Sequence, residues 1–100
     1  MEKRKPHCPL DRVKLLVQAG RVGATGSAFI GARALGIVDL AGMCEVVMAL
    51  TLRDFYKAMT THADHAIWQD VYRTRTQLGD LVYLKLTVID DVLIVSFKEL

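Results

Sequence analysis

Two residues near the C-terminal end of the chain, Tyr83 and Lys98, have types and positions suited to phosphate chemistry. The segments 81–89 and 92–98 are rich in β-branched and apolar residues and are separated only by Asp90-Asp91, which predicts a tight β-hairpin. If the two aspartates form the turn, Tyr83 lies directly opposite Lys98, with the Cβ atoms roughly 4.5–5.5 Å apart. A phenol and an ammonium at this spacing can contact one phosphate group and assist proton transfer. A surface pair without a function fits the same pattern.

The apolar pattern of the hairpin predicts its register. One face pairs Leu84 with Phe97, Leu86 with Val95, and Val88 with Leu93, and all six are apolar. The other face pairs Tyr83 with Lys98, Lys85 with Ser96, and Thr87 with Ile94. A shift of one residue would turn the apolar set outward, so we expect the first face to pack in the core.

Helices are expected before this hairpin. Apolar residues at helical spacing predict a helix over 10–19 that ends at Gly20, followed by a loop over 21–27 with room for a brief strand. A second helix is expected over 28–35, capped by Ser27 and ended by Gly36. Asp39 is expected to cap a third helix, which reaches Leu50.

Thr51 and Asp54 resemble a capping box, which predicts a fourth helix from Leu52 to Thr60 with Lys57 on its outward side. The segment 66–73 reads as a strand and 74–80 as a loop. Helices followed by an antiparallel sheet predict an α+β fold, in one domain spanning residues 1–100.

Composition is typical of a globular protein, and the two cysteines, Cys8 and Cys44, suit the reducing cytoplasm. Hydrophobic residues make up 52% of the 100 residues and charged residues 24%, which is enough for a packed core. No apolar run approaches the roughly 18 residues of a membrane span, and no secretory signal is visible, so we expect no membrane association. The formal net charge is +2, with the basic excess in residues 1–25, which permits nucleic-acid binding without establishing it.

Three other motifs are weaker indications of chemistry. His62, Asp64 and His65 are clustered, but a fourth metal ligand is missing nearby, so we favour a polar turn over a metal site. The glycines of residues 20–26 lack the lysine of a phosphate-binding loop. Cys8 has no evident third group to complete a nucleophilic site with a histidine.

Two long segments, DFYKAMTTHADHAIWQDVYR (54–73) and VYLKLTVIDDVLIVSFKEL (82–100), closely resemble the motility quorum-sensing regulator toxins, the MqsR family. The stretches 1–20 and 42–50 are similar to the same family, and the loop 74–81 matches least. The resemblance implies a RelE-like bacterial ribonuclease fold and a type II toxin that acts as an mRNA interferase. It implies metal-free cleavage of single-stranded mRNA at GCU-type sites, inhibition of translation and growth, and neutralisation by a zinc-binding, MqsA-like antitoxin that carries a DNA-binding domain.

The resemblance also implies a set of catalytic residues, which falls on Lys57, Gln69, Tyr83 and Lys98 in this sequence. Neither a cofactor nor a metal ion is expected. Strand alternation places Gln69 on one face with Ile67 and Val71, and this leaves open whether Gln69 points into the core or toward the site. Asp90 occupies a position where some members of the family carry histidine.

The competing hypothesis is a non-catalytic module that binds single-stranded RNA or a protein partner. A basic sheet face with aromatic residues such as Trp68, Tyr72 and Tyr83 can bind single strands through stacking and phosphate contacts alone. Such a module would leave RNA intact, whereas an enzyme would cut it.

Overall fold

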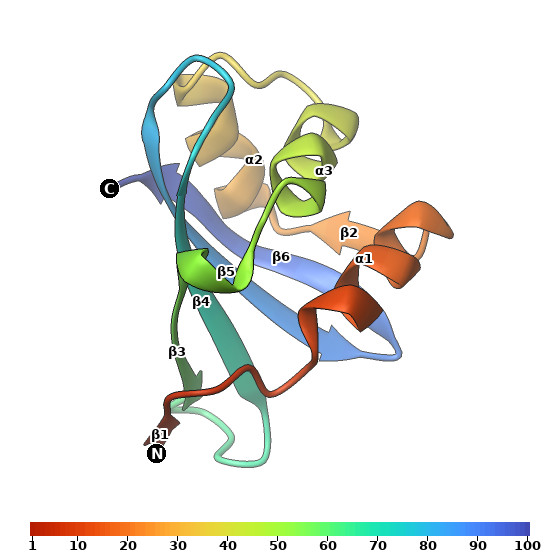
Figure 1. The fold of residues 1–100 in the computed structure, drawn as a ribbon, viewed down its shortest axis with the longest axis vertical. Coiled ribbons are helices and arrows are strands. Elements are labelled where there is room, and N and C mark those ends of the chain that lie inside the picture. Colours follow the sequence, from red (N-terminus) through yellow and green to blue (C-terminus); the bar gives the residue numbers. More distant parts are fainter.

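The computed structural model describes all residues, 1–100, and consists of a mixed sheet with three helices packed on one of its faces (Figure 1). The elements in chain order are β1 (Glu2–Lys3), α1 (Leu10–Gln18), β2 (Val22–Ala24), α2 (Gly26–Ala34), α3 (Leu40–Met48), a 3-10 turn (Leu52–Asp54), β3 (Phe55–Thr60), β4 (Trp68–Arg75), β5 (Leu81–Ile89) and β6 (Asp91–Glu99). The predicted α+β class is therefore confirmed.

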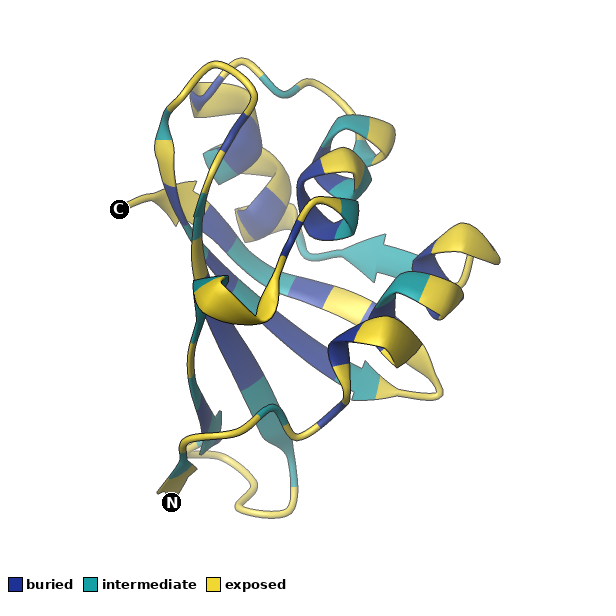
Figure 2. Ribbon diagram, in the orientation of Figure 1, coloured by how far each residue is buried: buried dark blue, intermediate teal, exposed yellow.

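The sheet has the strand order β1-β3-β4-β5-β6-β2, in which only β2 runs parallel to its neighbour. Its core lies between the helices and one sheet face, where Figure 2 shows the strands buried. One cluster of buried residues joins α1, α2 and α3 to strands β4, β5 and β6. Among its fully buried side chains are Met43 of α3, Leu84 of β5 and Phe97 of β6. No helix contributes to the opposite sheet face.

Local sequence signals account for the helix ends. Gly20 and Gly36 follow α1 and α2 with φ angles of +77° and +81°, as helix stops require. The Asp39 side chain accepts the backbone N–H of Gly42 and caps α3 as predicted. The cap of α2 is Thr25 rather than Ser27, because the Thr25 hydroxyl accepts the N–H of Ala28 and the helix begins at Gly26.

The helix predicted from Leu52 to Thr60 is wrong. The capping box of Thr51 and Asp54 is present, but it caps only a 3-10 turn, and the chain then forms strand β3. β3 pairs with β4 along most of its length, and β1 pairs with its other edge at Ala58 and Met59. This pairing, with the β propensity of the aromatic residues at its start, outweighs the helical spacing of the apolar residues.

The hairpin register is correct at the open end and wrong near the turn. Tyr83 pairs with Lys98, Leu84 with Phe97, and Lys85 with Ser96. A β-bulge at Val95 then shifts the strands, so that Leu86 pairs with Ile94, Thr87 with Leu93 and Val88 with Val92. Ile94 is therefore fully buried, while Leu93 is 41% exposed.

Thr25 supplies a physical reason for this bulge. Its hydroxyl donates to the Val95 carbonyl at 2.8 Å, and its N–H donates to the Ile94 carbonyl at 3.0 Å. Strand β2 pairs alongside β6 directly before Thr25. The turn itself is tighter than predicted, because Ile89 pairs with Asp91 and Asp90 alone adopts a positive φ of 64°.

The strand predicted over 66–73 is found two residues later, as β4. Its Asp70 carboxylate is buried on the helix side and accepts the N–H groups of His7 and Cys8 at 2.8 and 3.0 Å. The N-terminal segment is thereby fixed against the sheet. None of the helices is long and apolar enough to span a membrane.

Candidate active site

The sheet face opposite the helices carries all four residues predicted for the site. Alternate residues of β3, β4, β5 and β6 point to this side, and we call this surface the open face. Its central members are Lys57, Gln69, Val71, Arg73, Tyr83, Lys85, Ser96 and Lys98. Val71 is fully buried beneath its longer neighbours, although it does not belong to the core cluster of the helix side.

The Tyr83–Lys98 pair has the arrangement that the hairpin predicts. The two residues are direct cross-strand partners, and the Lys98 Nζ lies 5.2 Å from the centre of the Tyr83 ring. The Nζ of Lys85 lies 5.9 Å from the same ring centre. Two ammonium groups therefore flank one phenol.

Lys57 reaches this cluster from a strand rather than from the predicted helix. It pairs with Val71 of β4, which pairs on its other side with Lys85 of β5. The Lys57 Nζ donates to the Glu2 Oε2 at 2.8 Å, and this hydrogen bond raises the pKa of Lys57 and lowers that of Glu2. Lys57 is therefore held as a cation on the open face.

Gln69 lies on the same face as the other predicted residues. It pairs with Met59 of β3 and is the next outward residue of β4 after Val71. This places Gln69 diagonally from Lys57 and Lys85, at the roughly 7–8 Å typical of such neighbours. The alternative left open by the sequence is thus resolved, because Asp70 and Tyr72 point toward the helices instead.

Three further residues of the open face were missed as site candidates: Tyr56, Arg73 and Lys85. The hairpin register had already placed Lys85 on the face of Tyr83, so this signal was available in the sequence. Burial lowers the pKa of Lys85, and the nearby cations Lys98 and Lys57 lower it further. Tyr56 could not be found by alternation, because it is the extra residue of a β-bulge between Phe55 and Lys57.

Comparison with known proteins identifies the family of this chain. The family model described as "Motility quorum-sensing regulator, toxin of MqsA" matches residues 5–99. The chain is also similar to the mRNA interferase toxin MqsR of Escherichia coli (strain K12), with 61% identity over 99 residues, which cover 99% of each chain. This chain belongs to the MqsR toxin family.

Membership of the MqsR family agrees with the α+β architecture and with the RelE-like fold that the resemblance implied. The matched range, residues 5–99, includes strands β3 to β6 and thus the open face. The family description names MqsA as the partner of these toxins.

Other chemistry considered from the sequence gains no support in this MqsR-family chain. No group of three or more His, Cys, Asp and Glu side chains is placed to hold a metal ion. The Asp64 carboxylate accepts the N–H of Ala66 within the turn that follows β3. Burial raises the pKa of the Cys8 thiol, which disfavours the thiolate that a nucleophile needs.

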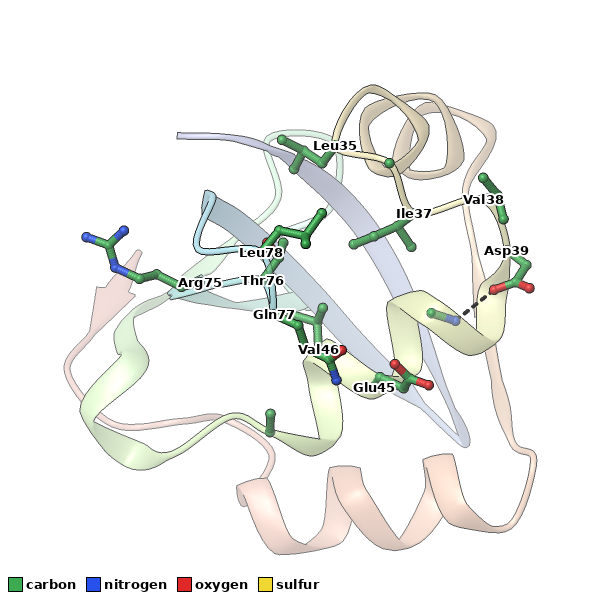
Figure 3. A pocket seen from close by; sticks show the side chains of 13 residues that line it. Leu35, Ile37, Val38, Asp39, Glu45, Val46, Arg75, Thr76, Gln77 and Leu78 are labelled. Atoms are coloured by element: carbon green, nitrogen blue, oxygen red, sulfur yellow. Dashed lines mark hydrogen bonds between the residues drawn. The ribbon is translucent and has the colours of Figure 1, made fainter.

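A pocket of about 290 Å³ lies elsewhere, between the α2–α3 connection, α3 and the β4–β5 loop (Figure 3). Leu78 and Ile37 line it with the acidic side chains Asp39 and Glu45 at its rim. None of the residues predicted for the site lines this pocket. Among the residues predicted for the site, Lys57 lines a smaller hollow of about 110 Å³ beside Tyr56 and Glu2, Gln69 and Tyr83 are half-buried, and Lys98 is exposed. A partly open sheet surface of this kind suits an extended polymer better than a small enclosed ligand.

Proposed function

We propose that this protein is the toxin of a type II toxin–antitoxin pair and a metal-independent endoribonuclease. Its substrate is single-stranded mRNA, cut at GCU-type sites, with inhibition of translation and growth as the result. The full-length similarity to a protein named mRNA interferase carries this proposal. The open face supports it, because Lys85 and Lys98 flank Tyr83 there and Lys57 lies on the same face.

The reaction uses the 2′-hydroxyl of the RNA as nucleophile. Its oxygen bonds to the adjacent phosphorus while the bond to the 5′-oxygen breaks, which leaves a 2′,3′-cyclic phosphate and a 5′-hydroxyl. Lys57 and Lys98 stabilise the negative charge that develops on the phosphoryl oxygens. Tyr83 donates a proton to the leaving 5′-oxygen, and Gln69 orients the phosphate.

Lys85 is our candidate for the general base that removes the proton of the 2′-hydroxyl. It lies between Tyr83 and Lys57 on the sheet and is partly covered by its neighbours. The surroundings lower the pKa of Lys85 and raise that of Lys57. Two lysines with pKa values shifted in opposite directions suit opposite roles, one as a base and the other as a fixed cation.

The partner that we propose is a zinc-binding antitoxin of the MqsA type with a DNA-binding domain. The family description, which names these proteins as toxins of MqsA, supports this assignment. The site of action that we propose is the cytoplasm, where mRNA is translated.

The test is incubation of the purified protein in EDTA with defined single-stranded RNAs that contain or lack GCU. We expect cuts at GCU with cyclic-phosphate ends, and loss of cutting in a Tyr83→Phe, Lys98→Ala double variant. Arg12→Ala is the control for loss of positive charge, since Arg12 is exposed on α1, on the other side of the sheet.

Two results would contradict parts of the proposal. RNA that is bound but stays intact would favour the non-catalytic binding module. Cutting that survives the double variant would keep the function and remove Tyr83 and Lys98 from the mechanism.

A further inference from the structure

Tyr56 and Arg73 form a stacked pair at the edge of the candidate site. The guanidinium carbon of Arg73 lies 3.6 Å from the centre of the Tyr56 ring. Arg73 is exposed and the Tyr56 residue is 37% exposed, so the stack faces solvent. Arg73 forms neither of the ion pairs found in the structure, so no carboxylate holds its guanidinium in this position.

The stack is adjacent to the residues proposed to act on the phosphate. Arg73 is the direct cross-strand partner of Tyr83. On the other side, the bulge in β3 turns Tyr56 and Lys57 to the same face, although they are consecutive in sequence, and the Lys57 Nζ lies 5.4 Å from the Tyr56 ring centre. Bulges often re-aim side chains in this way beside functional sites.

We propose that the Tyr56–Arg73 stack is a nucleobase subsite, which holds a base of the single-stranded RNA next to the phosphate that is cut. This inference rests on the proposed function. A guanidinium stacked on an aromatic ring presents a second planar surface, and unpaired bases stack on both arginine planes and aromatic rings. Lysine at position 73 would keep the charge but lose the planar surface.

A nucleic acid is favoured over an acidic protein segment by the geometry of the neighbours. The stack provides a flat surface for a base, Lys57 lies beside it, and Lys98 follows on the far side of Tyr83, where both can meet the charged backbone. Alternation of stacking surfaces and phosphate contacts is the arrangement by which proteins bind single strands.

The experiment pairs enzyme variants with RNAs that lack one base. Each RNA carries a single abasic ribose at one position around the GCU site. We measure the cleavage KM, and also the Kd of matched RNAs in which a 2′-deoxy nucleotide at the cut site prevents reaction. For the unaltered protein, removal of the base that occupies the subsite is expected to weaken binding roughly 5- to 150-fold at one position.

Arg73→Lys and Tyr56→Leu are expected to weaken binding of the intact RNA and to abolish the abasic penalty at that position only. Tyr56→Phe keeps the ring and is expected to retain the penalty. Arg75→Lys is the matched control, because Arg75 is an exposed arginine of the same strand that donates to the Gly79 carbonyl instead of stacking.

An abasic penalty that is unchanged in Arg73→Lys and Tyr56→Leu would overturn the inference. The Kd values of the non-cleavable RNAs measure base binding independently of cleavage. Failure of the subsite is therefore distinguishable from failure of the proposed nuclease activity, which would appear as intact RNA with the unaltered protein.

Discussion

A lysine acts as a base only after losing its proton, and on the open face Lys85 is the lysine whose surroundings favour that loss. Burial and the charges of Lys98 and Lys57 both lower its pKa. The pKa of Lys57, in contrast, is raised by its hydrogen bond to Glu2. We therefore expect the two lysines to control different parts of the pH dependence of cleavage.

Replacement of Lys85 tests the base. Arginine at this position keeps a positive charge but does not deprotonate in the accessible pH range. We expect Lys85→Arg to lower kcat by roughly 10²- to 10⁴-fold and to remove the rise in rate with pH that deprotonation of Lys85 produces. The measurement is the pH–rate profile, and an unchanged rising limb in the variant would exclude Lys85 as the base.

Replacement of Glu2 tests the cation. The Glu2 carboxylate raises the pKa of Lys57, so protonated Lys57 persists to higher pH than it would alone. In Glu2→Gln the pKa of Lys57 falls, and the decline of activity at alkaline pH is expected to begin at lower pH. Below that range the activity should stay close to normal. If the alkaline decline keeps its position, Glu2 does not control Lys57 in the reaction.

At the scale of the elements, close packing of helix α2 on strand β6 keeps Phe97 in the core and leaves Lys98 on the open face. Gly31 permits this contact, because a Cβ at that position would lie 1.8 Å from the Phe97 carbonyl oxygen. That oxygen belongs to the backbone of the sheet and cannot move aside without displacing the strand.

We therefore expect Gly31→Ala to lower the free energy of unfolding by about 1–3 kcal/mol or more, as overpacking does. Gly26→Ala in the same helix is the control, since nothing lies within 4 Å of the position that its Cβ would take and alanine restricts the unfolded chain. Urea denaturation of both variants provides the comparison. Equal stability of the two would show that α2 can shift away from β6.

The sequence could predict the elements that are determined by nearby residues, and it failed where distant residues determine the structure. Gly20, Gly36 and Asp39 end or cap helices through their own backbone preferences, so these boundaries were predictable. The pairing of Tyr83 with Lys98 followed from the apolar alternation near the open end of the hairpin. The helix predicted over 52–60 failed because long-range strand pairing, which the local pattern does not contain, determines β3.

The two β-bulges mark the limit of prediction in the site. The bulge at Val95 is held by a hydrogen bond from Thr25, which is 70 residues away in the chain. In a regular strand Tyr56 and Lys57 would point to opposite faces of the sheet. The bulge, in which Tyr56 is the extra residue, breaks this alternation. Lys57 was correctly expected to point outward, although the helix that suggested it does not exist.

For the molecule as a whole, the two faces of the sheet differ in role. The face under the helices forms the hydrophobic core and stabilises the fold, whereas the open face carries a cluster of positively charged side chains. The chain carries only a small net charge of +2, so the RNA binding that we propose would depend on this local concentration of cations. Binding should therefore weaken steeply as salt is added.

Each phosphate contact made by a lysine is expected to contribute about 0.7 to the slope of log K against log salt for a single strand. Lys98→Ala should reduce the slope by about this amount, whereas Arg12→Ala should leave it unchanged. Fluorescence anisotropy with the non-cleavable RNA, over a series of salt concentrations, gives both slopes. Equal slopes in the two variants would place RNA away from the open face.

The two edge strands of the sheet come from the beginning of the chain, yet they pair with strands made much later. β1 joins residues 2–3 to β3, and β2 joins residues 22–24 to β6, which spans Asp91–Glu99. Folding during synthesis proceeds from the N-terminus, and pairings this distant in sequence form late. The open face therefore stays incomplete during synthesis until β6, which carries Lys98, has been made. If the open face cuts mRNA as we propose, the nascent protein cannot cut the message that encodes it until strand β6 has been made.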